Sequence, residues 1–494
     1  MERLLKMKNN QIFFQNQTGI EGTSETKDVF GEELAAGDFN GDRHADLAVG
    51  VPLENIKDIK DAGVVNAIAG SDEGLTADGN SILFQDQPGV EGTSEAYDNF
   101  ARYLSVGDFD NDGRDDLAVG VPFEDIKDIA DAGGVNIFAG SDNGLTAEKS
   151  QFWFQDQPGV EGTSEQGDRF GSSVAAGDFN GDSFDDLAVG VPGEAIGSIS
   201  GGAVNVFSGS DNGLTSQNNQ IWFQNQPGVE GTTEDGDRFG DTLAAGDFDG
   251  DGFDDLAIAA PSENIGDLPA GAVNIFRGST DGLTANDNLI FFQDQTGVEG
   301  TSENGDNFGE SLTAGDFNGD GYDDLAIGAD LETIKDIQGA GAVNILNGSE
   351  KGLTAKDSQI WFQDQLGVEG TSETFDRFGN SLAAGDFNGD GYDDLAVGVM
   401  YETVNESRDG AVNVFNGSVD GLTSDRNQIW FQDQPGIEGT SEAYDNFGSS
   451  LSVGDFNSDG YDDLAIGVPE ETIGDFGSAG AANIIYGSAD GLTA

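Results

Sequence analysis

One aspartate-rich motif recurs seven times along this chain and constrains its fold more than any other feature. Its clearest copy, residues 385–395, reads Gly-Asp-Phe-Asn-Gly-Asp-Gly-Tyr-Asp-Asp-Leu. Successive copies begin 70, 70, 69, 69, 70 and 69 residues apart. A period of this kind is typical of propellers, solenoids and arrays. It therefore overrides the expectation of about three domains that a length of 494 residues would suggest.

Each repeat holds four short segments typical of β-strands, with turn residues between them. In the third repeat these segments are residues 175–179, 186–191, 202–207 and 220–223. No stretch has a sustained 3.6-residue apolar period, so almost no helix is expected. Four antiparallel strands repeated seven times predict an all-β fold, a seven-bladed β-propeller. Small residues such as Ala175 suit the narrow innermost strand, and aromatic side chains suit the outermost one.

The two ends of the chain predict that the ring closes. The chain opens with a strand of the outermost type at residues 11–17, whereas the last repeat stops after a third-strand segment, residues 481–486. We expect the first strand to complete the last blade, which removes an exposed sheet edge. A linear solenoid would show distinct capping repeats instead.

The predicted organisation is an N-terminal tail, residues 1–10, followed by a single propeller over residues 11–494. Its blades are expected at approximately residues 28–87, 98–157, 168–226, 237–295, 306–365, 376–434 and 445–494, the last together with 11–17.

Positions 1, 3, 5 and 9 of the motif, counted from its first aspartate, carry oxygen-bearing side chains. In the sixth copy these are Asp386, Asn388, Asp390 and Asp394. The alternation directs them at a common centre, and the backbone carbonyl at position 7 is expected to join them. Many hard oxygens with little room for retained water favour Ca²⁺ over Mg²⁺. A single copy could be a metal-free turn whose side chains bond only the backbone, but seven copies favour the metal.

We call positions 1–9 of each copy the aspartate loop, and we predict up to seven Ca²⁺, one per loop. The predicted ligands are Asp38, Asn40, Asp42, His44 and Asp46; Asp108, Asp110, Asp112, Arg114 and Asp116; Asp178, Asn180, Asp182, Phe184 and Asp186; Asp247, Asp249, Asp251, Phe253 and Asp255; Asp316, Asn318, Asp320, Tyr322 and Asp324; Asp386, Asn388, Asp390, Tyr392 and Asp394; and Asp455, Asn457, Asp459, Tyr461 and Asp463.

Positions 6 and 8 of the aspartate loop carry two further expectations. Glycine stands at position 6 in five copies, where a tight loop needs a positive φ angle. Arg43 and Ser183 replace it in the other two copies, which leaves the occupancy of those two sites open. The aspartate at position 8, such as Asp393, is expected to point away from its own loop.

The composition excludes several classes of function. There are 93 acidic and 20 basic side chains, for a net charge of −73. Such a chain is a poor partner for nucleic acid or for an anionic membrane surface. It has no cysteine for disulfide or thiol chemistry. No apolar run approaches the ~18 residues of a membrane span, and residues 1–10 lack the apolar core of a signal peptide.

Several motifs recur in register with the aspartate loop. A Phe-Gly pair precedes it, as at residues 170–171, and Gly-Val-Pro follows it, as at residues 50–52. Together they resemble the FG-GAP repeat of the integrin α-subunit propeller, over essentially the whole chain after residue 10. The pattern departs at Ala101, Asp330 and Met400. In integrins only some blades carry the calcium loop, whereas here all seven do.

The resemblance implies extracellular or cell-surface recognition, with a protein ligand on the face opposite the calcium loops and no catalysis. The loops between second and third strands vary most among the copies, and binding residues favour such loops. They are residues 53–62, 123–132, 193–201, 262–270, 331–340, 401–409 and 470–479. We expect a monomeric propeller.

Two alternatives stay open. A carbohydrate-binding propeller would need aromatic platforms, but Trp153, Trp222, Trp361 and Trp430 lie mid-strand and are interpreted as core. A glycoside-cleaving enzyme could use paired carboxylates. However, those carboxylates are equivalent in every blade, and the only histidine, His44, lies in an aspartate loop. A histidine-based triad is therefore absent.

Overall fold

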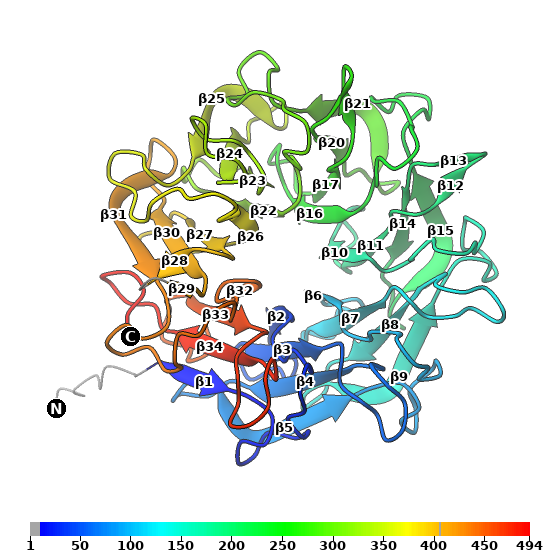
Figure 1. Cartoon of the computed structure of the whole chain (residues 1–494). Coiled ribbons are helices and arrows are strands. Elements are labelled where there is room, and N and C mark those ends of the chain that lie inside the picture. Colours follow the sequence, from blue (N-terminus) through cyan, green and yellow to red (C-terminus); the bar gives the residue numbers. More distant parts are fainter. Residues whose placement is uncertain (1–9, 405–406) are drawn as a thin grey trace.

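The structure, a computed structural model, describes residues 10–404 and 407–494. These residues form seven four-stranded antiparallel sheets arranged around a central channel (Figure 1). The described part of the chain contains no helix. The predicted all-β, seven-bladed propeller is therefore confirmed.

The strands of each blade follow one another from the channel to the rim. In that order they are β2 (Glu33–Gly37), β3 (Asp46–Val51), β4 (Val64–Ala69) and β5 (Thr76–Leu83); β6 (Tyr103–Gly107), β7 (Asp116–Val121), β8 (Gly134–Ala139) and β9 (Thr146–Trp153); β10 (Ser173–Gly177), β11 (Asp186–Val191), β14 (Ala203–Ser208) and β15 (Thr215–Trp222); β16 (Thr242–Gly246), β17 (Asp255–Ala260), β20 (Ala272–Arg277) and β21 (Thr284–Phe291); β22 (Leu312–Gly315), β23 (Asp324–Ala329), β24 (Ala342–Asn347) and β25 (Thr354–Trp361); β26 (Phe378–Gly385), β27 (Asp394–Val399), β30 (Ala411–Asn416) and β31 (Thr423–Trp430); and β32 (Leu451–Gly454), β33 (Asp463–Val468), β34 (Ala481–Ile485) and β1 (Gln11–Phe13).

Three loops between second and third strands contain a short hairpin of their own. The pairs are β12 (Ala195–Ile196) with β13 (Ile199–Ser200), β18 (Asn264–Ile265) with β19 (Leu268–Pro269), and β28 (Thr403–Val404) with β29 (Ser407–Arg408).

The second strand of every blade is buried on both faces, because it is covered by the two neighbouring blades. All six residues of β3 are buried, which explains its continuous run of small and apolar residues. Gly50 is required there, since a Cβ at this position would collide with the carbonyl oxygen of Ala101 in the next blade.

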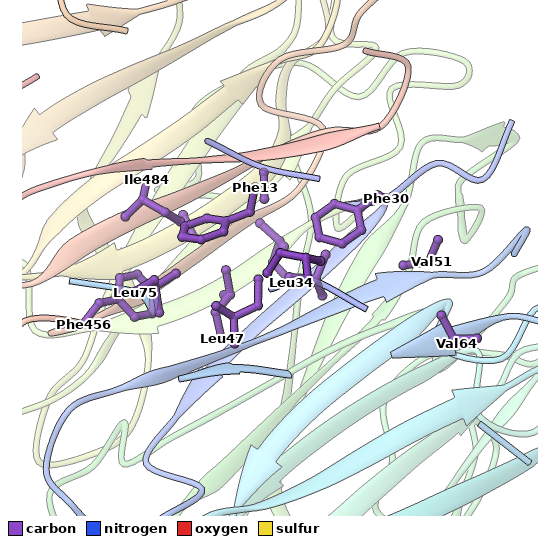
Figure 2. Packing of buried hydrophobic residues seen from close by; sticks show 14 of the residues in the cluster. Phe13, Phe30, Leu34, Leu47, Val51, Val64, Leu75, Phe456 and Ile484 are labelled. Carbon is purple, nitrogen blue, oxygen red and sulfur yellow. The ribbon is translucent and has the colours of Figure 1, made fainter. Parts of the chain in front are cut away.

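Hydrophobic side chains fill the junctions between blades. At the junction of the last and first blades, Phe13, Phe30, Leu34 and Ile484 belong to one buried cluster (Figure 2). The tryptophans contribute at the rim. Trp153 is half-buried with its ring centroid 5.1 Å from that of buried Phe207 in the next blade, consistent with its interpretation as core.

The ring closes as predicted, with β1 beside β34 in the last blade (Figure 1). Phe13 pairs with Ala482 in this ladder. The strand covers 11–13 rather than the expected 11–17, because a turn follows in which the Gln17 N–H donates to the Phe14 carbonyl oxygen at 3.4 Å. Asn10 adds a side-chain hydrogen bond, from Nδ2 to the Ile484 carbonyl oxygen at 2.6 Å.

Candidate metal centres

The seven aspartate loops lie on one face of the ring, because each joins the innermost strand of a blade to the second. Neighbouring loops are hydrogen-bonded to each other: the Asp115 N–H donates to the Asp38 carbonyl oxygen at 3.1 Å. The same bond, from Ala45 to Asp455 at 3.1 Å, crosses the junction of the first and last blades. We call this side the aspartate-loop face and the other side the opposite face.

Position 1 organises each aspartate loop. In the sixth blade, Oδ1 of Asp386 accepts the N–H groups of Gly389 and Asp390 at 2.7 and 3.1 Å, and Oδ2 accepts that of Gly391 at 2.8 Å. At position 5, Asp390 Oδ1 accepts the N–H of Tyr392 at 3.2 Å. Because each carboxylate has about four lone-pair sites, these bonds leave acceptor capacity for a cation.

Positions 3 and 9 meet on the other side of the same loop. Asn388 Nδ2 lies 3.1 and 3.0 Å from the two oxygens of Asp394. Asp394 is fully buried and accepts the N–H of Gly417 at 2.9 Å. Burial is the main reason that the pKa of Asp394 is raised to about 7; the hydrogen bonds from Gly417 and Asn388 lower it, and the charges of Asp390 and Asp386 raise it. The predicted side-chain ligands of this loop are thus brought together.

The backbone at position 6 has a positive φ angle in all seven loops. The angle is 88° at Gly391, and it is 75° at Arg43 and 72° at Ser183. The two loops without glycine therefore adopt the same turn at a conformational cost, about 1–2 kcal/mol for a residue with a Cβ. At position 7, the role of the carbonyl oxygen remains a prediction.

The donor set fits a hard divalent cation. Buried oxygen atoms without a hydrogen-bond partner occur in several loops: Asp110 Oδ1, Asp249 Oδ1, Asp255 Oδ2 and Asn457 Oδ1. In the loops that begin at Asp108 and Asp247, oxygens of the three aspartates at positions 1, 3 and 5 lie within 4.8 Å of one another. Buried oxygens of this kind are costly unless paired, and a cation ligated by oxygen would pair them.

Two loops carry a fourth aspartate, at position 3, and each has a basic partner that sequence reasoning missed. Lys149 Nζ lies 3.2 Å from Asp110 Oδ2, and Arg277 Nη1 lies 2.6 Å from Asp249 Oδ2. The basic residue offsets the added charge, so these loops keep a charge similar to the others. The partners stand 39 and 28 residues from the aspartates they contact, outside the motif.

The aspartate at position 8 connects adjacent loops. Asp115 Oδ2 accepts the N–H of Asp38 in the preceding blade at 2.7 Å, and Asp393 Oδ2 accepts that of Asp316 at 2.9 Å. Ala45 occupies this position in the first blade and cannot make the bond. The residue expected to point away from its own loop is therefore a link between blades.

Comparison with known proteins matches the FG-GAP repeat at residues 30–65, 100–138, 170–207, 239–276, 308–346, 378–415 and 447–485, more than half of the chain. The chain belongs to the FG-GAP repeat family. Integrin alpha-8 of Mus musculus is 32% identical over 249 residues, which cover 49% of this chain and 21% of the integrin. Integrin alpha-PS2 of Drosophila melanogaster is 37% identical over 238 residues, which cover 46% of this chain and 15% of the integrin.

This FG-GAP propeller is integrin-α-like, but the matched region spans about a fifth or less of the length of these curated relatives. Among solved structures, an exotype rhamnogalacturonan lyase covers 92% of this chain and 72% of its own, at 13% identity and a TM-score of 0.45. A likeness at that level carries no argument about activity. No helix in the described residues could cross a membrane.

The opposite face of the FG-GAP propeller exposes aromatic side chains. Tyr97, Phe375 and Tyr444 are 55%, 41% and 58% exposed. Their backbones are hydrogen-bonded to the variable loops; for example, the Tyr97 N–H donates to the Lys60 carbonyl oxygen at 2.9 Å. Tyr444 also makes an edge contact with Tyr401, with ring centroids 6.5 Å apart. The sequence signal was available, since the third, fourth and fifth copies have glycine where these aromatics stand.

The wall of the central channel departs from sevenfold symmetry. The first residue of the innermost strand is Glu33 in one blade and Tyr103 in the next, whereas serine or threonine occupies the equivalent position in others. Burial raises the pKa of Glu33 to about 8 and that of Glu310, which also lines the channel, to about 7. These acids distinguish the channel from the repeated aspartate loops, but no histidine accompanies them.

Proposed function

We propose that this protein is a calcium-binding, non-catalytic recognition module. It would act outside the cell or at the cell surface and present its opposite face to a protein ligand. The observation that carries the proposal is the difference in composition between the two faces. Seven near-identical, oxygen-lined loops occupy one face, while variable loops and exposed aromatics occupy the other. Membership of the FG-GAP family and the integrin relatives support the same assignment.

Calcium would act structurally in this proposal. Each ion would neutralise carboxylates that otherwise repel one another across a loop, such as Asp108, Asp110 and Asp112. Because neighbouring loops are hydrogen-bonded, order in one loop supports the next. We further propose that residues 11–494 form one folding unit, which is a monomer.

The exposed aromatics are suited to a protein partner. Tyrosine and other large aromatic residues dominate binding energy at protein interfaces when a partner buries them. The net charge of −73 would steer a basic partner toward the propeller and repel acidic ones. Phe375, Tyr401 and Tyr444 therefore form the proposed centre of contact.

A binding experiment tests this assignment. Wild-type protein and a Phe375→Ala/Tyr444→Ala variant are immobilised and exposed to cell-surface extracts in Ca²⁺, with Val419→Ala as a control at a residue that is 74% exposed. We expect the aromatic variant to lose at least tenfold of the captured material and the control to lose none. Protease treatment of the extract should abolish capture. Capture that survives the protease but not glycosidases would replace the protein ligand with a carbohydrate.

A further inference from the structure

A second carboxylate motif repeats in every blade, separate from the aspartate loops. A glutamate is followed by an aspartate three residues later and by another glutamate 26 residues after that, and a glutamine stands ten residues before the first glutamate. The first glutamate of the motif stands at residues 25, 95, 165, 234, 303, 373 and 442, with identical spacing in all seven copies. The first three residues of the motif lie between blades, and the last glutamate lies in the loop between second and third strands, on the opposite face.

The fold brings these residues closest at the second, fourth and sixth blades, where the three carboxylates of the motif meet. At the second blade, carboxylate oxygens of Glu95, Asp98 and Glu124 lie within 4.8 Å of one another. Asp98 and Glu124 are 2% and 4% exposed, so the cluster is largely shielded from water. The side-chain amide of Gln85 ends against it, with Nε2 3.0 Å from Glu124 Oε2.

The charged neighbours of this cluster are acidic. Burial, with smaller contributions from the carboxylates of Glu95, Asp125 and Asp131, raises the pKa of Asp98 to about 7. Burial likewise raises the pKa of Glu124 to about 8, with Asp98 as the next contributor that raises it. Among the described residues, no basic side chain lowers the pKa of Asp98 or Glu124, although Arg408 lowers that of Asp376 at the sixth blade. The cluster at the second blade therefore requires protons or a metal cation at neutral pH.

Buried oxygens without a hydrogen-bond partner favour a metal cation over protons. Gln85 is 1% exposed, and its Oε1 has no hydrogen-bond partner although its amide abuts the cluster. A half-turn of this amide would place Oε1 beside the carboxylates. At other junctions, Oε2 of Glu332 and Oδ1 of Asp376 are unpartnered in residues that are 4% and 0% exposed. Buried oxygens without a donor are rare unless water or an ion completes them.

We propose that each of the seven blade junctions binds a divalent cation through these three carboxylates and the glutamine amide oxygen, forming a second ring of sites on the opposite face. The ligands are all hard oxygens with no nitrogen or sulfur, which favours a hard cation such as Ca²⁺ over Zn²⁺ or Cu²⁺. Gln85 follows the outermost strand of one blade, whereas Glu124 belongs to the next blade. The ion would therefore cross-link neighbouring blades beside the variable loops.

Anomalous scattering from crystals grown in Ca²⁺ tests the proposal. We expect a peak at each junction, in addition to those at the aspartate loops, in the full-length protein. Glu124→Gln, which keeps the size and hydrogen-bonding capacity of the side chain, should remove the peak at its own junction alone. Asp390→Asn should remove only the peak of the sixth aspartate loop.

The outcomes separate the two rings of sites. Peaks at the aspartate loops without peaks at the junctions would overturn the junction sites and leave the proposed function standing. Peaks at neither place would overturn both. Thermal melting gives a second readout, since loss of a junction ion predicts a smaller Ca²⁺-induced rise in melting temperature for Glu124→Gln. If protons alone satisfy the cluster, that variant would instead melt higher at pH 8 with and without Ca²⁺, and the proposal would fail.

Discussion

The side chain at position 6 of the aspartate loop shows how a single residue tunes a repeated turn. Ser183 holds a φ angle of 72°, where Gly391 holds 88° in an equivalent loop. A Cβ at Gly391 would meet no atom within 4 Å, so any penalty there comes from the backbone alone. Ser183 and Gly391 occupy the same position in two loops, so serine can be changed to glycine at one and glycine to serine at the other.

We predict that Ser183→Gly stabilises the protein by about 0.5–1 kcal/mol, because the relief of strain exceeds the added chain entropy of glycine in the unfolded state. The reverse change, Gly391→Ser, should destabilise by a similar amount. Denaturant unfolding in EDTA measures both without a metal contribution. A shift of the same sign in the two variants would contradict the strain argument.

Position 5 separates the charge of a ligand from its role in the turn. Asp390→Asn keeps the oxygen that accepts the Tyr392 N–H but removes the carboxylate charge. We predict the loss of one bound Ca²⁺ per chain and a smaller Ca²⁺-induced rise in melting temperature. Calcium content after dialysis measures the first effect. Glu148→Gln, the same charge change on the exposed part of β9, should leave both values unchanged.

Among elements, the three-residue strand β1 has a disproportionate role, because it is the outermost strand of a blade whose other strands come from the far end of the chain. Phe13 is 3% exposed in the cluster shared by the last and first blades. We predict that Phe13→Ala lowers the free energy of unfolding by about 3–5 kcal/mol. Val419→Ala should change it little. Equal stability of the two variants would show that β1 does not close the ring in solution.

At the level of the complete ring, buried carboxylates are repeated seven times and set the pH dependence of stability. Burial raises the pKa of Asp46 to about 7 and those of Asp255 and Asp463 to about 8, from an ordinary value of 3.8. At a pH between the ordinary pKa of 3.8 and these raised values, the folded chain without metal holds protons on these carboxyl groups, whereas the unfolded chain has released them. Its stability therefore falls as the pH rises from about 4 to about 8.

We predict that the melting temperature in EDTA decreases between pH 5 and pH 8. Saturating Ca²⁺ should oppose that trend, because the metal requires the deprotonated carboxylates. The gap between the two melting curves should then widen with rising pH. Scanning calorimetry at pH 5, 6.5 and 8 with each additive measures it. A melting temperature in EDTA that rises over this interval would contradict the assignment of raised pKa values.

Much of the architecture could be predicted because it depends on local sequence patterns that repeat in every blade. The period of the aspartate loop indicated the number of blades, and the unequal chain ends indicated closure by the first strand. The extent of that strand was wrong, since the turn after Phe13 depends on the Gln17 side chain and N–H. The side chains that meet within each aspartate loop were also predictable, because all of them lie within nine residues, whereas their role as metal ligands stays a prediction.

The contacts that the sequence did not reveal join residues from different blades or distant parts of one blade. Asp115 reaches the loop of the preceding blade, Lys149 reaches Asp110 from an outer strand, and Glu124 meets Asp98 and Gln85 at a junction. Each pair depends on the angle and register at which sheets pack around the channel.

The linear order of residues therefore decides the repeat, the strands, the side chains that meet in each aspartate loop and the partner of the first strand, because each of these follows from spacing along the chain. Packing of seven twisted sheets decides which carboxylates become neighbours across a junction and which aromatics stay exposed on the opposite face. The reason is physical: the energies of buried charge and exposed apolar surface depend on distances through space, which exist only once the ring has closed.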